Sequence, residues 1–425
     1  MTVTVEERIR RAAMQLDEAI EERAGAGGTY LVERRTAPGR RVAWIAAAAA
    51  LVVVAGAVVV MQGGGVETVS APAAGLVDGE GWERLPESPL GGRFQHLGVS
   101  TGTGMLVWGG HDGETDRTDG AFFDAVSATW KAVPKAPLAG NRGDAIGAWT
   151  GTEVVVVNGI DGQVKAAAYR PATNRWRKLP DPPLANAASM MTKAVFVDGA
   201  VVVVAVSEEG EPGVRNEVAV LDPATSTWRI GAVPASSFGS GFDTVVVGSE
   251  AVLVARYGMG GKGCGASVVA AYSPTANAWR SLDGGPLSSV FASAVASTGT
   301  EVFVAGGPCG GSDDSRLAFL LDPATGRWRT AAEAPVAVRG DIRYGEVFTG
   351  TAVLTFAADG TPVFYDLASD SWEIGVAGPV GKRLQETPWV WAGGRLVAFS
   401  GGVTEGKDGL CCPMLAGGYT YTLRP

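Results

Sequence analysis

Hydrophobic residues follow two different patterns along the chain. Residues 42–61 form a run of twenty residues without a charge, and at a rise of 1.5 Å per residue such a helix crosses a bilayer core of about 30 Å. From residue 82 onward the apolar residues come in short runs that are separated by turns rich in Gly, Pro, Asn and Asp, which is typical of β-strands. The pattern therefore predicts one transmembrane helix followed by an all-β domain.

Basic residues flank the apolar run on one side only. Four arginines lie within the eight residues before it, and the next basic residue after it is Arg84. This asymmetry predicts a cytoplasmic N-terminus and an extracytoplasmic β domain. A cleaved secretory signal is the alternative, but its charged region would be 41 residues long and its apolar run unusually extended. The expected organisation is a cytoplasmic tail at 1–41, a single membrane span at 42–61, a flexible Gly-rich linker at 62–81 and the β domain at 82–425.

The cytoplasmic tail contains one helical pattern, at residues 4–23. Thr4 and Glu7 match a capping box, and apolar residues recur on one face of the helix. A short solvated helix is the simplest interpretation, because a single helix of this length is marginally stable alone. A cytoplasmic partner, such as a regulatory protein, is the alternative.

A tryptophan recurs at nearly constant spacing in the all-β part. Successive copies are separated by 48, 46, 52, 51, 49 and 44 residues, and all but the first stand six residues after an Asp or its substitute, as in LDPATSTW. This interval is the length of one four-stranded propeller blade. The tryptophans are Trp82, Trp130, Trp176, Trp228, Trp279, Trp328 and Trp372.

Each interval shows the same order of strands, which are designated a to d. In the first, the strands are expected at residues 94–100, 104–108, 120–123 and 130–133, with Gly109-Gly110 after the second. The Gly pair permits close backbone approach at positive φ, and the bulky indole is expected to pack between neighbouring sheets. The Gly pair after strand b, the aromatic residue near the end of strand c and the Asp-to-Trp spacing resemble kelch repeats of galactose oxidase-like β-propellers.

The resemblance covers roughly residues 80–425 and implies a propeller, but it is weakly specific for function. Kelch-like proteins include binding scaffolds, copper oxidases and enzymes that process sialic acid. There are seven groups of a, b and c strands and seven Trp-led d strands. Because the first d strand precedes every group, it is expected to complete the last blade and close the ring. The prediction is therefore an all-β, seven-bladed kelch-like propeller closed by an N-terminal d strand, with six blades as the alternative.

Topology divides the connections between two faces of such a ring. The d-to-a and b-to-c connections share one face, here called the distal face because both ends of the ring lie at the other, membrane-proximal face. Arginines that begin strand a could ring the channel mouth and bind a carboxylate or a sugar-like group. The alternative is that each Arg pairs with an Asp for structural reasons. Residues 142–144 and 339–341 both read RGD, but they fall at the same point of a blade, so repeat ancestry explains them better than a role in adhesion. These distal residues are Arg93, Arg142, Arg339 and Arg383, with Asp144, Asp341 and His111.

All four cysteines fall in b-to-c connections, and outside the membrane they should be oxidised. A Cys264–Cys309 bridge with a vicinal Cys411–Cys412 bridge is one arrangement. Two bridges that tie the blade-seven loop across the distal face are another. A thiolate metal cluster is a third, although no His or CxxC accompanies the cysteines.

The loop HDGETDRTDG spaces acidic residues as a calcium site does, with Asp112, Glu114 and Asp116 as the candidate ligands. It lacks the usual Gly and closing Glu, so a solvated acidic loop without a cofactor is the main expectation. Only two histidines exist, His96 and His111, and neither a copper site nor a Ser-His-Asp triad is recognisable.

The balance of charge excludes one class of partner. Residues after the membrane span carry 27 basic and 37 acidic side chains, which is unfavourable for binding nucleic acid. Arg outnumbers Lys 27 to 8, which indicates a GC-rich bacterial genome. The expected function is a membrane-anchored binding module for a protein or cell-envelope glycan. Alternatives are a carbohydrate-active lyase, hydrolase or epimerase that uses Arg and carboxylates at the channel mouth, and a signalling component that acts through the N-terminal helix.

Overall fold

The computed structural model divides the chain into two units, residues 1–75 and 76–425. The predicted cytoplasmic helix and membrane span lie outside the described residues, and no helix within those residues has the length and apolar character to cross a bilayer. The residues that the structure describes are 81–140, 143, 145–160, 163–184, 191–206, 216–234, 242–255, 268–309, 315–339, 347–357, 359–378, 384–385, 387–403 and 417–423.

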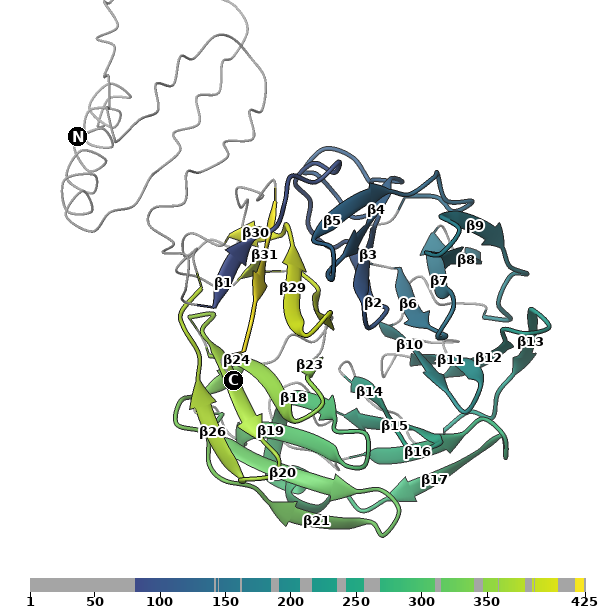
Figure 1. Cartoon of the computed structure of the whole chain (residues 1–425). Helices are drawn as coiled ribbons and strands as arrows, with labels where there is room; N and C mark the ends of the chain where they lie inside the picture. Colours follow the sequence, from purple (N-terminus) through teal and green to yellow (C-terminus); the bar gives the residue numbers. More distant parts are fainter. Residues whose placement is uncertain are drawn as a thin grey trace, which may run out of the picture. The chain divides into compact units, whose positions relative to one another are not determined.

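Seven antiparallel sheets, one for each blade, stand around a central axis in this part of the chain, which confirms the all-β, seven-bladed propeller (Figure 1). Strand a of each blade is innermost and strand d is outermost. The first three blades are β2 (Leu97–Ser100), β3 (Gly104–Trp108), β4 (Gly120–Asp124) and β5 (Thr129–Ala132); β6 (Ile146–Trp149), β7 (Val154–Ile160), β8 (Gln163–Arg170) and β9 (Arg175–Lys178); and β10 (Met191–Val197), β11 (Ala200–Val206), β12 (Glu217–Asp222) and β13 (Thr227–Ile230).

The remaining blades follow the same order with small additions. A 3-10 turn, η2 (Gly285–Ser288), precedes the fifth blade, and β27 (Leu384–Gln385) pairs with β30 (Gly402–Val403) beside the seventh. These blades are β14 (Phe242–Val247), β15 (Glu250–Ala255), β16 (Val269–Ser273) and β17 (Ala278–Leu282); β18 (Val290–Ser297), β19 (Val302–Pro308), β20 (Leu317–Asp322) and β21 (Arg327–Thr330); β22 (Val338–Arg339), β23 (Val347–Phe348), β24 (Ala352–Ala357), β25 (Pro362–Asp366) and β26 (Ser371–Ile374); and β28 (Trp389–Ala392), β29 (Arg395–Phe399), β31 (Gly418–Tyr421) and β1 (Trp82–Arg84).

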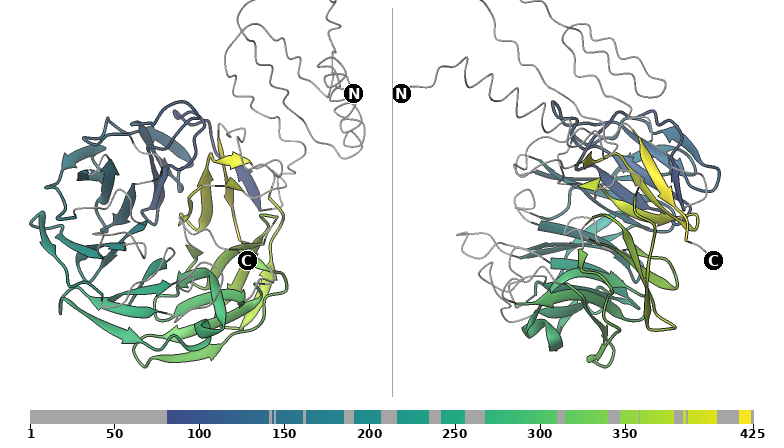
Figure 2. Two further views of the ribbon diagram at one scale, coloured as in Figure 1. Left: turned by 180° about the vertical axis from the view of Figure 1, so that it is seen from behind. Right: turned by 90° about the vertical axis from the view of Figure 1, so that its left-hand side faces the viewer.

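The first described strand closes the ring, as the repeat count predicts. β1 pairs antiparallel with β31, and Trp82 lies opposite Tyr421. The ladder extends beyond the strand at both ends, because Leu85 N donates to Gly418 O at 2.9 Å and Thr422 N donates to Gly81 O at 2.8 Å. The purple strand lies beside the yellow one in front and rear views alike (Figures 1 and 2). Closure pairs two strand edges that would otherwise be exposed.

Indole rings connect each blade to the one before it. Their Nε1 donates to the carbonyl oxygen of a residue just after the preceding strand d, and this bond forms in six of the seven repeats among the described residues. The exception is Trp176, whose buried Nε1 has no acceptor there. The bonds are Trp82 to Val376, Trp130 to Pro86, Trp228 to Pro180, Trp279 to Ala232, Trp328 to Asp283 and Trp372 to Ala332, at 2.7–3.1 Å.

The hydrophobic core lies between adjacent blades. Met105 and Phe123 of the first blade, for example, share one buried cluster with Val397 and Phe399 of the seventh. Because each sheet is covered on both faces, its middle strands are continuous apolar runs, as in residues 201–204, and do not alternate. The ring is therefore held by a series of interfaces, each of which depends on its two neighbouring blades.

The start of the first blade differs from the sequence expectation. Strand a was expected from residue 94, but β2 begins at Leu97. Phe94 forms an isolated antiparallel bridge with His111, and Gln95 adopts a positive φ of 55°. The chain therefore turns before strand a begins. The predicted Gly pair is confirmed in its role, because Gly110 has a φ of 89° and a Cβ there would lie 2.8 Å from the Phe94 carbonyl oxygen.

Candidate functional site

Two of the predicted distal residues have side chains that the structure describes, Arg93 and His111. For Arg339 only the backbone is described, in β22. The other predicted binding residues, Arg142, Asp144, Asp341 and Arg383, lie outside the described residues. Among the cysteines, Cys309 directly follows β19, while Cys264, Cys411 and Cys412 also lie outside them, so the pairing stays a prediction.

Arg93 is buried at the distal end of the first blade, where its guanidinium holds the b-to-c loop in place. Nη1 and Nη2 donate to the two carboxylate oxygens of Asp119 at 2.9 and 3.1 Å. Nη1 also donates to Gly109 O at 3.0 Å, and Nε donates to Gly91 O at 3.1 Å. A bidentate pair of this kind fixes geometry as well as charge.

The backbone of Arg93 connects the first blade to the seventh. Its N–H donates to Ser400 Oγ at 2.7 Å, and the Ser400 hydroxyl donates to Arg93 O at 2.8 Å. Gly401 N donates to the same carbonyl oxygen at 2.9 Å. The side chain and backbone of Arg93 are thus both engaged within the protein. This geometry favours the structural alternative for Arg93 over direct contact with a ligand.

The acidic loop that follows β3 is organised by its own side chains. Asp112 Oδ1 accepts hydrogen bonds from Glu114 N at 3.0 Å and Thr115 N at 2.7 Å, and Oδ2 accepts one from Arg117. Burial raises the pKa of Asp112, but these backbone bonds and the Arg117 charge together hold it below its ordinary value. The carboxylate of Asp112 therefore closes the loop, and the described residues contain no cluster of three or more side chains suited to hold a metal ion.

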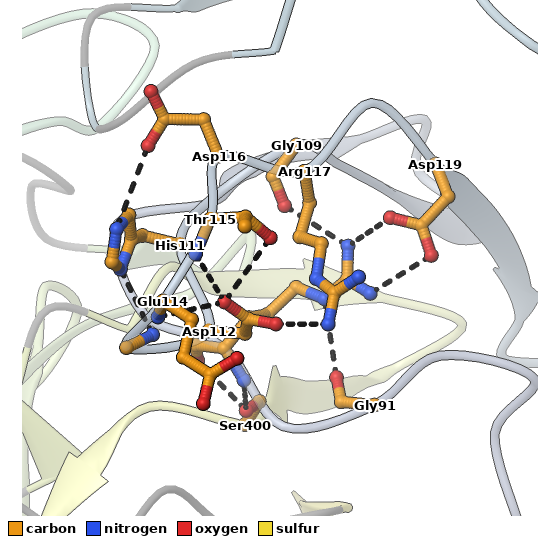
Figure 3. Close-up of polar contacts among 12 residues, drawn as sticks. Gly91, Gly109, His111, Asp112, Glu114, Thr115, Asp116, Arg117, Asp119 and Ser400 are labelled. Carbon is orange, nitrogen blue, oxygen red and sulfur yellow. Dashed lines mark hydrogen bonds and ion pairs between the residues drawn. The ribbon is translucent and has the colours of Figure 1, made fainter.

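His111 is buried beneath this loop. Its Nδ1 accepts a hydrogen bond from Gly113 N at 2.9 Å, which assigns the ring proton to Nε2. Nε2 faces Asp116 Oδ1 at 3.8 Å, and the ring contacts Phe94 with centroids 5.4 Å apart. Asp116 is half-exposed, so the pair presents a carboxylate to solvent (Figure 3).

His96 is buried between the first and seventh blades. Its ring lies 5.9 Å from that of Phe399, and neither nitrogen has a hydrogen-bond partner of normal geometry among the described residues. Burial, with a further contribution from the Arg93 charge, lowers the pKa of His96 to about 3, although the Phe399 carbonyl partly opposes the shift. His96 is therefore neutral at physiological pH and packs as a core residue.

A second polar site, which the sequence reasoning missed, lies between blades two and three. The cavity there has a volume of about 430 Å³ and opens among the a-to-b and c-to-d turns. At its base the buried carboxylate of Glu153 is held by Arg177, whose Nε and Nη2 approach Oε2 at 3.0 and 2.7 Å. Residues lining the cavity include Thr152, Glu153, Arg170, Arg177, Phe196 and Pro223.

The Glu153–Arg177 pair has counterparts around the ring. In blades four and five the same positions hold Glu250 with Arg280 and Glu301 with Arg329. In blade seven the charges are exchanged, because Arg395 Nη1 lies 3.5 Å from Glu83 Oε2. The sequence signal is an acid just before strand b with an Arg just after the repeat Trp. The two positions are 24 residues apart in blade two, so the signal becomes visible only after the repeats have been aligned with one another.

In comparisons with known proteins, no protein-family model and no curated protein matches the chain. The fold is shown by its seven sheets alone. A propeller is a scaffold that hosts many functions, so the function has to be inferred from the sites.

Proposed function

We propose that the protein is a membrane-anchored, kelch-like propeller that binds a protein or cell-envelope glycan on its distal face, outside the cytoplasmic membrane. The apolar run at 42–61 and the arginines before it support the anchor and its orientation. The repeat pattern supports the kelch-like assignment. The closed ring supports a binding role, because it is a rigid base from which loops project.

One observation carries this proposal: the distal loop of the first blade is preorganised. Asp112 closes its tip, His111 supports it from beneath and the Arg93–Asp119 pair fixes its base. Exposed acidic groups, Glu114 and Asp116, project from this frame. A loop that is already ordered loses little conformational entropy when it binds, which favours recognition of a polar or basic partner.

Photo-crosslinking compares the two faces directly. A benzophenone amino acid at Glu114, in the full-length protein in native membranes, is expected to form adducts with an envelope component. The matched position is Val126, which is 73% exposed in a c-to-d turn of the same blade and on the opposite face. We expect no specific adduct from Val126. Absence of adducts from Glu114, or equal adducts from both positions, would contradict binding on the distal face.

Cysteine labelling tests the compartment. If the propeller is extracytoplasmic, its cysteines are oxidised. Alkylation of the denatured full-length protein without reductant is therefore expected to label none of the 4 cysteines, and prior reduction should make all 4 reactive. Mass spectrometry gives the number of labels. Full labelling without reductant would exclude the oxidised state and argue against the proposed location.

A further inference from the structure

Arg170 is a position at which blade two departs from the repeat, and it is the first residue of the c-to-d turn. In blade five that residue is Asp322, whose Oδ1 accepts a hydrogen bond from Ala324 N at 2.9 Å. In blade four it is Ser273, whose Oγ accepts one from Ala276 N at 3.1 Å. An arginine has no acceptor to offer. Residue 170 contributes only its backbone to the blade-two turn, where Arg170 O accepts a hydrogen bond from Thr173 N at 3.3 Å, and a side-chain bond from the Tyr169 hydroxyl to Asn174 Oδ1 at 2.8 Å also spans the turn.

Arg170 extends instead toward the buried acid of the cavity. Its Nε and Nη2 lie 3.2 and 3.1 Å from Oε1 of Glu153. The same carboxylate is already bound by Arg177, so one negative charge faces two positive ones and the set in contact carries a net charge of +1. In blades four and five the corresponding acid pairs with one arginine among the described residues. Positions at which a sequence abandons a local stabilising residue are expected to be functional or strained sites.

The surroundings of the extra charge suit a small ligand. The side chain of Arg170 is 51% exposed, whereas that of Glu153 is buried. Phe196 and Pro223 provide ring surfaces in the lining of the cavity. Ser226 Oγ accepts a hydrogen bond from Arg177 Nη1 at 2.7 Å, which fixes the position of Arg177. A volume of about 430 Å³ lies within the range of small-molecule sites.

The blade-three turn that lines the cavity carries a carboxylate of its own. Asp222 precedes Pro223 in the blade-three turn, where its Oδ1 accepts hydrogen bonds from Ala224 N at 2.8 Å and Thr225 N at 3.4 Å. It therefore serves its own turn and contacts neither arginine. Arg170 retains donor capacity on Nη1, which has no acceptor among the described residues.

We propose that the cavity between blades two and three binds a small carboxylate, which pairs with Arg170 while the body of the ligand packs against Phe196 and Pro223. Guanidinium is suited to this task because its planar fork matches a carboxylate. The site lies at the opposite end of the blades from the distal loops. Carboxylate binding can therefore be tested independently of partner binding at those loops.

Calorimetric titration of the full-length protein in detergent tests the ligand class. Sodium glucuronate represents a carboxylated sugar, N-acetylalanine represents a peptide C-terminus and glucose is the neutral control. We expect saturable binding of at least one carboxylate and none of glucose, and the tighter carboxylate identifies the source. Failure of both carboxylates to bind, or equal binding of glucose, would overturn the assignment.

Arg170→Asp separates binding from folding. It restores the turn residue of blade five, where Asp322 coexists with the Glu301–Arg329 pair, so thermal unfolding should occur at the wild-type temperature or above. Carboxylate affinity should fall by roughly tenfold or more, as expected for loss of a charged hydrogen-bonding partner. Arg175→Ser, which removes an exposed arginine at the start of β9, directly after the same turn, should leave affinity within about twofold. Retained binding in Arg170→Asp, or equal loss in both variants, would contradict the proposed role of Arg170.

Discussion

Replacement of Trp82 by Ala is expected to lower the free energy of unfolding of the propeller by about 3–5 kcal/mol, the usual range for removal of a large buried aromatic. The indole is 3% exposed and lies 4.8 Å from the ring of Tyr421 and 6.1 Å from that of Trp389. Its Nε1 donates to Val376 O at 2.9 Å, across the interface with the sixth blade. The substitution therefore weakens the strand that closes the ring and the interface beside it.

Guanidinium unfolding of the full-length protein in detergent, followed by far-ultraviolet circular dichroism, measures this effect. Trp82→Phe should retain most of the packing and lose chiefly the hydrogen bond, at a cost of about 1–2 kcal/mol. Val126→Ala, at an exposed position, should change stability by less than about 0.5 kcal/mol. A Trp82→Ala variant as stable as Val126→Ala would show that β1 does not contribute to the closed ring.

Replacement of Arg93 by Ala is expected to cost about 2–4 kcal/mol, the second largest effect. The Asp119 carboxylate is 52% exposed, so solvent screening limits the contribution of the ion pair itself to about 1 kcal/mol. The larger part comes from the Gly91 and Gly109 carbonyls, which lose their donor, and from the cavity left at a buried position. Arg93→Lys should recover only part of the loss, because an ammonium cannot reproduce the bidentate fork.

The pH dependence of stability checks the same pair. Burial raises the pKa of Asp119, but hydrogen bonds and charge from Arg93 outweigh it and hold the pKa below its ordinary value of 3.8. A carboxyl whose pKa is depressed on folding stabilises the protein above its unfolded pKa, and this stabilisation is lost as the pH falls through the folded value. The stability difference between wild type and Asp119→Asn should therefore be full at pH 7 and shrink below about pH 4. A difference that stays constant would exclude the ion pair as its source.

Strand order and ring closure could be predicted from the sequence because the information is repeated. Seven tryptophans at similar intervals indicate the same packing of an indole between neighbouring blades. A d strand before the first group of a, b and c strands can pair only with strand c of the last blade. The strands of blade one show how closely the pattern follows the structure, since residues 104–108 were expected and β3 spans Gly104–Trp108. Errors appeared where the repeat stops, as at the turn before β2.

The roles of individual polar residues could not be predicted in the same way. From the sequence alone, Arg93 near the start of strand a is equally compatible with a ligand-binding role and with a structural ion pair. Its partners Asp119 and Ser400 come from two different blades. The cavity beside Glu153 depends on Arg170, which in the sequence is simply a substitute for the repeat Asp. Its significance follows only from the three-dimensional register, which brings residues from separate strands to one carboxylate.

Hydrogen exchange at β1 tests the central claim, that the first strand of the propeller completes its last blade. In the full-length protein, mass spectrometry of peptides that contain residues 82–85 and 418–421 should show slow exchange in both, because the two segments share one ladder. Trp82→Ala should accelerate exchange in both segments together. Exchange of residues 82–85 at the rate of an unstructured chain, while 418–421 stays protected, would contradict closure of the ring by this strand.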